Sequence, residues 1–158
     1  PELDKKILTY KLVQARRLAL NEFKDSLSDA SKKERNYWQP FLEKNRWMFG
    51  LSYFVLLDEQ RIDLWDTAEL KGAIPQATNY IFQVEKKFSD PDWCRKHKCN
   101  TPVKPKCTII FGRSNNWNIE EKTAFRLLND SLHGIEIITF DHLYSRAEKI
   151  LDSLEKES

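Results

Sequence analysis

Apolar residues recur at helical spacing through the first quarter of the chain. Leucine and phenylalanine side chains are separated by Lys, Arg and Glu at Leu8, Leu12, Leu20, Phe23 and Leu27. This pattern predicts one amphipathic helix from Leu3 to Leu27. Its apolar face has to pack against the rest of the domain or against a second copy of the chain. We therefore interpret residues 1–30 as a helix and candidate oligomerisation element, and residues 31–158 as the domain that follows it.

A second helix is predicted by a capping box. Ser31-Lys32-Lys33-Glu34 places Ser at the N-cap position and Glu three residues later. The predicted helix carries the apolar residues Trp38, Phe41 and Leu42. Pro40 lacks a backbone donor, so we expect it to bend or divide this helix.

The middle of the chain predicts a hairpin and then a long helix. The apolar runs Tyr53–Leu57 and Ile62–Trp65 flank the polar turn Asp58-Glu59-Gln60, a pattern typical of a β-hairpin. Ala68–Phe88 follows as a helix with Pro75 inside it. Its apolar face carries Ile74, Ala77, Ile81, Val84 and Phe88.

The second half predicts a strand–helix–strand unit. Residues 89–106 are rich in Pro and Lys and predict a basic loop. Cys107–Arg113 is a continuous apolar run, as expected of a strand buried on both faces, and Ile135–Phe140 is interpreted as another buried strand. Between them Asn118–Leu132 predicts a helix with Asn118 as its N-cap, and Asp141 is expected to cap a last helix that runs to Leu154. Such a unit favours parallel pairing, so we predict a mixed α/β domain.

Composition and charge exclude few classes of protein. The formal net charge is +2 and the sequence pI is about 8.5, so nucleic-acid binding needs cations concentrated on one face. No apolar run approaches the ~20 residues of a membrane span.

Three cysteines do not form an even disulfide framework, which favours a reducing compartment. We expect a cytoplasmic protein with no membrane partner. Because the chain begins at Pro1, we also expect a fragment or a trimmed protein.

Two groups in the basic segment have candidate chemistry. Four possible zinc ligands occur there, Cys94, His97, Cys99 and Cys107. The sequence spacing between Cys99 and Cys107 is longer than is usual between paired zinc ligands. Cys107 also begins a predicted buried strand, where a free cysteine acts as a small hydrophobic residue. We therefore expect no structural zinc.

The second group is a set of cations beside an indole, comprising Trp93, Arg95, Lys96, Lys98, Lys104 and Lys106. Such a segment can bind phosphates while the indole stacks on a base. A solvated insertion explains the same residues, and the sequence leaves both interpretations open.

Four separated blocks carry a family resemblance. They are Glu34-x-x-x-Trp38 with the run Phe41–Gly50, then Ala68–Tyr80, Ile109–Arg113 and Ile135–Leu143. Together they resemble the nuclease domain of the Shedu anti-phage defence proteins. The resemblance implies a restriction-endonuclease-like fold of the PD-(D/E)xK kind, a central mixed sheet flanked by helices. It also implies a bacterial, metal-dependent endodeoxyribonuclease that uses Mg²⁺ or Mn²⁺ on double-stranded DNA and forms a homo-oligomer.

The resemblance also implies particular site residues. In this family an acid on one strand and Glu-x-Lys on the next hold the metal and position the attacking water. A Gln-x-x-x-Tyr motif on the following helix supports the site, and Gln76-Ala77-Thr78-Asn79-Tyr80 has that form. Glu34 is the candidate for the carboxylate that many nucleases of this kind bring to the metal from the first helix of the nuclease fold; the alternative is a plain capping box.

The Glu-x-Lys motif itself is displaced. Glu69-Leu70-Lys71 fits the pattern, but only four residues separate Lys71 from Gln76, too few for a turn and a helix entry. Residues two apart on a helix do not share a face, so we interpret this motif as a decoy. The alternative catalytic set is Asp63, Glu69 and Lys71, with Asp63 as the strand acid instead of a solvent-facing residue.

The family pattern would place Glu-x-Lys directly after Ile62–Trp65, where Asp66-Thr67-Ala68 contains no lysine. Either stretches are missing near residues 50–54 and after Trp65, or the chain is a degenerate nuclease. The second case gives the alternative function, a catalytically incomplete nuclease fold that binds nucleic acid or serves as an assembly module.

Overall fold

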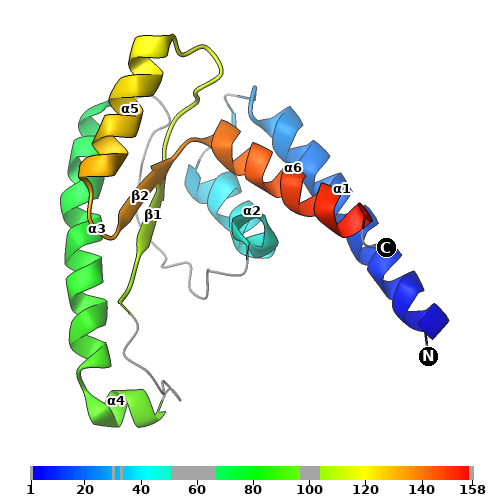
Figure 1. Ribbon diagram of the computed structural model, residues 1–158, viewed down its shortest axis with the longest axis horizontal. Coiled ribbons are helices and arrows are strands. Elements are labelled where there is room, and N and C mark those ends of the chain that lie inside the picture. The colour runs from blue at the N-terminus through cyan, green and yellow to red at the C-terminus, as the bar shows by residue number, and fades with distance from the viewer. Residues whose placement is uncertain (1, 30, 33, 51–66, 97–103, 157–158) are drawn as a thin grey trace. The chain divides into compact units, whose positions relative to one another are not determined.

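The computed structural model of the chain describes residues 2–29, 31–32, 34–50, 67–96 and 104–156 (Figure 1). The chain divides into two compact units. The helical unit comprises Pro1–Asp63 and Phe140–Ser158, and the sheet unit comprises Leu64–Thr139. Helices combined with a small parallel sheet agree with the α/β class that the sequence predicts. A restriction-endonuclease-like core stays a prediction, because the sheet of the described residues has two strands.

The helical unit contains α1 (Glu2–Ser26), the π-helix η1 (Glu34–Trp38), α2 (Gln39–Lys44), the 3-10 helix η2 (Arg46–Phe49) and α6 (Phe140–Lys156). Its core is an aromatic cluster around Phe23, which is fully buried. The Phe23 ring centroid lies 5.3 Å from that of Trp38, 5.8 Å from that of Phe41 and 6.2 Å from that of Phe140. Because aromatic rings bury large apolar areas, this cluster joins α1 to η1, α2 and α6.

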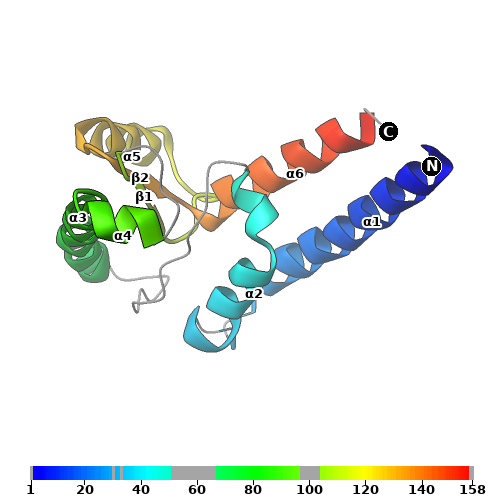
Figure 2. The same cartoon turned by 90° about the horizontal axis from the view of Figure 1, so that it is seen from below.

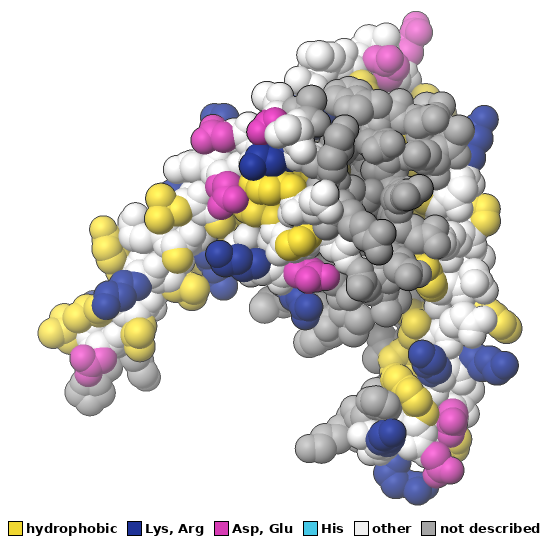
Figure 3. Space-filling view, turned by 180° about the vertical axis from the view of Figure 1, so that it is seen from behind, with side chains coloured by type: hydrophobic (Ala, Val, Ile, Leu, Met, Phe, Trp, Pro, Cys, Tyr) yellow, Lys and Arg dark blue, Asp and Glu magenta, His cyan; other side chains and the backbone are white. Residues whose placement is uncertain are grey.

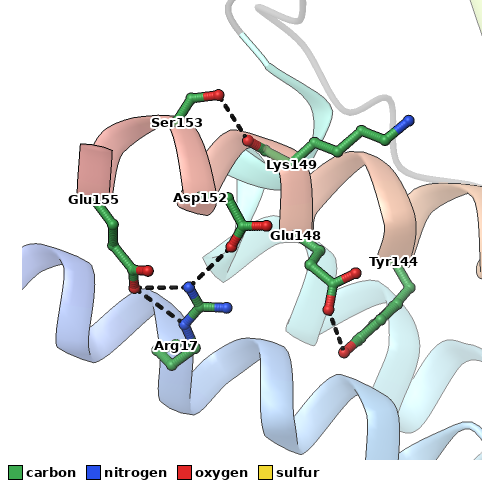
Figure 4. Close-up of polar contacts among 7 residues, drawn as sticks. All are labelled: Arg17, Tyr144, Glu148, Lys149, Asp152, Ser153 and Glu155. Carbon is green, nitrogen blue, oxygen red and sulfur yellow. Dashed lines mark hydrogen bonds and ion pairs between the residues drawn. The ribbon is translucent and has the colours of Figure 1, made fainter. Parts of the chain in front are cut away.

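α1 and α6 lie side by side and run in opposite directions (Figures 1 and 2). Next to the aromatic cluster, Arg17 of α1 binds two carboxylates of α6 (Figure 4). Its Nη2 lies 3.2 Å from Asp152 Oδ1 and 2.7 Å from Glu155 Oε1. The hydrogen bond to Glu155 raises the pKa of Arg17 above its ordinary value. All three side chains are partly exposed, so these two ion pairs add little stability compared with the core.

The apolar face of α1 differs from the predicted one. Val13, Leu20 and Phe23 are buried, but Leu8 is 66% exposed and Leu12 is 49% exposed. Contact with α6 determines which face of α1 is buried. Helical spacing alone does not show on which side of α1 that partner helix lies. The exposed apolar side chains are Leu3, Ile7, Leu8, Tyr10, Leu12 and Leu18. Figure 3 shows hydrophobic side chains along the α1 arm, interspersed with Lys and Arg.

The second predicted helix begins later than its capping box suggests. Ser31 donates both its N–H and its hydroxyl to Asp29 Oδ1, at 2.9 and 2.6 Å, and η1 starts at Glu34. Ser31 is therefore part of a local turn and precedes the helix by three residues. Pro40 lies in the first turn of α2, where a missing N–H costs no helical hydrogen bond, and so it divides the predicted helix into η1 and α2.

The sheet unit contains α3 (Thr67–Phe88), α4 (Pro91–Lys96), β1 (Cys107–Ile110), α5 (Ile119–Ser131) and β2 (Ile135–Ile138). The strands pair in parallel with Cys107 opposite Ile135 and Ile110 opposite Ile138, which confirms the predicted pairing. Helix α3 packs against both strands and α5 packs against β2.

Both strands are shorter than predicted. Gly112 has a φ of 63°, a conformation that favours glycine and turns the chain away two residues after β1 ends. Strand β2 ends at Ile138 because α6 begins at Phe140. Asp141 therefore lies in the first turn of α6 and is not its N-cap. Burial on both faces is also only partial, because Ile109 is buried while Thr108 and Ile110 are half-buried.

Two asparagines fix α5 at its ends. The Asn118 side chain accepts the Glu121 N–H at 2.9 Å, and Glu121 Oε2 accepts the Asn118 N–H at 2.8 Å, which confirms the predicted N-cap. Near the other end, Asn129 binds the backbone of β2. Its Oδ1 accepts the Ile137 N–H at 2.7 Å and its Nδ2 donates to the Ile137 carbonyl at 2.9 Å.

Two further predictions concern the basic segment and the hairpin. The basic segment, predicted as a loop, contains the short helix α4, which Asp90 starts by accepting the Asp92 N–H at 2.9 Å. The predicted hairpin Tyr53–Trp65 lies outside the described residues. Across the ranges that the structure describes, no helix is both long enough and apolar enough to cross a bilayer.

Candidate functional site

Gln76 and Tyr80 lie one turn apart on α3, which brings them to neighbouring positions on the sheet unit. Both side chains are half-buried, and Ala77 between them is buried. Residues four apart on a helix are neighbours, so the amide and the phenol lie on the same flank. Helix α3 packs on the parallel strands, so this flank borders the helix face that meets the sheet. The arrangement can donate and accept hydrogen bonds to a ligand beside α3.

The Glu69-Leu70-Lys71 motif is helical. All three residues belong to α3, and Lys71 is exposed. Positions two apart on a helix are about 200° apart around its axis. The expectation that this motif lies on a helix is therefore confirmed, while its interpretation as a decoy and the alternative catalytic role of Glu69 and Lys71 both stay predictions.

The candidate carboxylates give no metal site within the described structure. Glu34 is the first residue of η1 in the helical unit, but its side chain lies outside the description. Asp63 also lies outside the described residues. Among the residues that are described, no group of three or more His, Cys, Asp or Glu could hold a metal ion. The ligand set that the resemblance implies therefore has no counterpart in the described part of the chain.

The basic segment is partly organised by α4. Trp93 is half-buried, with its ring centroid 5.6 Å from that of Phe88 and the two rings perpendicular. Arg95 pairs with Asp92 at 3.1 Å, although both side chains are more than three-quarters exposed. Such an exposed ion pair contributes little free energy, so a more strongly binding anion can displace Asp92 from the Arg95 guanidinium. Lys96, Lys104 and Lys106 are exposed, and Lys98 lies outside the described residues.

The cysteines are described only in part. Cys94 donates its thiol hydrogen to the Phe88 carbonyl at 3.3 Å. Cys107 is half-buried at the start of β1, and burial raises the pKa of its thiol. His97 and Cys99 lie outside the described residues, so the expectation of no structural zinc stays a prediction.

The sequence analysis missed a buried polar pair at the carboxyl ends of the two strands. Ser114 and Thr139 are both buried, and their hydroxyl oxygens lie 2.8 Å apart. In parallel sheets this end is where ligands are usually bound. Arg113 beside the pair is half-buried. The signal available in the sequence was one polar residue directly after the run Cys107–Arg113 and another near the end of the predicted strand Ile135–Phe140.

The chain matches a known protein family. The family described as Shedu protein SduA, C-terminal, matches residues 55–144, more than half of the chain. The matched range includes α3, α4, both strands and α5, but not Glu34 or α1. No curated protein matches the chain.

Proposed function

Since this chain belongs to the Shedu family through the SduA C-terminal domain, we propose that it is the metal-dependent DNA endonuclease domain of an anti-phage defence protein. The observation that supports this most directly is the pair Gln76 and Tyr80. They stand in the order and spacing of the family's Gln-x-x-x-Tyr motif, and they share one flank of a helix that covers the parallel strands.

In the proposed reaction, water adds across a phosphodiester bond of double-stranded DNA. The new bond joins the water oxygen to phosphorus, and the bond from phosphorus to one sugar oxygen breaks. The water loses a proton and the leaving oxygen gains one. The Gln76 amide and the Tyr80 hydroxyl can hydrogen-bond a phosphate oxygen or orient the attacking water.

We propose Mg²⁺ or Mn²⁺ as the cofactor, on the basis of the resemblance. Such an ion would stabilise the charge that develops on the phosphate oxygens. The described residues provide no ligand set for it, so no step of the reaction is assigned to the ion.

The finer structural parts of the proposal concern the fold, the partners and the compartment. β1 and β2 would be two strands of a restriction-endonuclease-like sheet, and the protein would act in the bacterial cytoplasm. Homo-oligomerisation is proposed through α1, whose exposed apolar side chains gain from being covered.

A second function is favoured by one specific observation, the helical position of Glu69-Leu70-Lys71. If no other Glu-x-Lys serves the site, the chain is a catalytically incomplete nuclease fold that binds nucleic acid or assists assembly.

One experiment separates the two functions. The protein is incubated with linear duplex DNA in Mg²⁺, in Mn²⁺ and in EDTA, and cleavage is followed on denaturing gels while binding is measured separately in EDTA. Metal-dependent cleavage supports the nuclease. Binding without cleavage under every condition would instead support the incomplete nuclease.

A further inference from the structure

One flank of α3 continues the polar row that begins at Gln76 and Tyr80. Positions seven apart on a helix are offset by only about 20°. Gln83 therefore follows Gln76 along the helix, and Lys87 follows Tyr80. The first two side chains are half-buried, while Gln83 and Lys87 are exposed. All four carry hydrogen-bond donors.

Between Gln76 and Lys87 this flank carries no carboxylate. The helix has no acidic residue between Glu69 and Glu85. Glu85 lies two residues before Lys87, which places it about 200° away around the helix axis. An anion beside Gln83 and Lys87 would therefore meet donors and a cation from this flank, with the nearest helical carboxylate on the other side.

The flank leads to the basic residues of α4. Lys87 is the penultimate residue of α3, and α4 begins three residues after α3 ends, at the same end of the helix (Figure 1). The contact between Trp93 and Phe88 holds the two helices together there. From Gln76 to Lys87 the rise along the helix is about 16 Å, at about 1.5 Å per residue. Along the axis of a DNA duplex the rise is about 3.4 Å per base pair, so this length spans roughly five base pairs.

We infer that the flank formed by Gln76, Tyr80, Gln83 and Lys87 is the surface along which duplex DNA lies between the reacting phosphate and α4. The Lys87 ammonium pairs with a backbone phosphate, and the Gln83 amide donates to a phosphate or sugar oxygen. Amides and lysines are typical groups for such sequence-independent contacts. The inference rests on the proposed function, because Gln76 and Tyr80 mark the end of the surface at which cleavage takes place.

The test compares two neighbouring lysines in the full chain. Lys87→Gln removes the cation from the flank, and Lys86→Gln removes the same charge from an exposed position about 100° further round the helix. Affinity for a fluorescent duplex is measured by anisotropy in EDTA over a range of salt concentrations. We expect Lys87→Gln to weaken binding about fivefold and to lower the salt-dependence slope by about one, with Lys86→Gln close to the parent.

The outcomes separate this inference from the proposed function. Equal effects of Lys87→Gln and Lys86→Gln would overturn the inference, even if the parent protein cleaves DNA. Conversely, the parent protein could show no cleavage while Lys87→Gln alone weakens DNA binding. That result would support the binding surface and overturn the proposed nuclease activity. A parent protein that does not bind duplex DNA would overturn both.

Discussion

The hydroxyl oxygens of Ser114 and Thr139 lie 2.8 Å apart and are both shielded from solvent. Each residue follows one of the two parallel strands, so this hydrogen bond ties together the segments that leave the carboxyl ends of β1 and β2. A buried hydroxyl that loses its partner has no water to replace it, which makes the pair a point of high local sensitivity.

Replacing Thr139 by Val should therefore destabilise the protein by about 1–3 kcal/mol, because the hydrogen bond between the two buried hydroxyls is lost. The free energy of unfolding is measured by urea titration. The matched comparison is the double variant Thr139→Val with Ser114→Ala, which should lose less than the sum of the single variants. Strictly additive effects would show that the two hydroxyls are energetically independent.

Replacing Asn129 by Leu should cost about 2 kcal/mol, since the Ile137 N–H and carbonyl lose both of their partners. Asn129→Asp is the control, because it keeps an acceptor for the Ile137 N–H while losing the donor to the carbonyl. We expect an intermediate loss for Asp. Hydrogen exchange at the Ile137 amide should accelerate most in the Leu variant, and an unchanged exchange rate would contradict the role of Asn129.

Two substitutions on α1 should differ sharply in their cost. Phe23 is fully buried at the centre of the aromatic cluster, so Phe23→Ala should destabilise the protein by about 3–5 kcal/mol. Leu18 on the same helix is 70% exposed, and Leu18→Ala should change the stability by less than about 0.5 kcal/mol. Thermal melting of both variants checks this. Similar losses would mean that the exposed side of α1 is covered in solution.

That exposed side gives a prediction about assembly. If α1 mediates oligomerisation, Leu8→Glu with Leu12→Glu should lower the particle mass in light scattering, because a charge in an apolar contact is costly to desolvate. Removing residues 1–30 is a poorer test, since it also removes Leu20 and Phe23 from the core. The thermal midpoint of the substituted protein serves as the folding control. An unchanged mass at equal concentration argues against assembly through these two side chains.

Cleavage should distinguish Gln76 from Lys71. Gln76→Ala should reduce cleavage of linear duplex DNA by about tenfold or more, because it removes a hydrogen-bonding group from the proposed site. Lys71 is exposed and its position lies about 140° from that of Gln76 around the helix, so Lys71→Ala should have little effect. Both proteins are compared at equal folded concentration. A dead Lys71→Ala beside an active Gln76→Ala would assign catalysis to the Glu-x-Lys motif.

The helices were predictable where periodicity and capping act locally. The bounds of α3 differ from the predicted helix by one residue, and Asn118 caps α5 as its sequence suggests. Faces that depend on a distant partner were harder to predict. The spacing on α1 correctly pointed to Leu20 and Phe23, but it also pointed to Leu8 and Leu12, which are exposed, and it missed the buried Val13.

The candidate site was predictable only as a motif. Gln76-x-x-x-Tyr80 could be found by its spacing, and the close approach of Lys71 to Gln76 correctly indicated a helix. The Ser114–Thr139 bond joins residues 25 positions apart and depends on the parallel pairing. The Asn129 contact depends in the same way on how α5 returns along β2. Neither follows from a local pattern.

The hydrogen bonds of Asn129 also decide where the sheet can gain a strand. The Ile138 carbonyl accepts a hydrogen bond from the N–H of Phe111, the residue that follows β1, so the adjacent Ile137 directs its polar groups to the opposite edge. Asn129 occupies both of those groups. A foreign strand approaching β2 would have to displace this amide, which protects that edge against unwanted pairing between molecules.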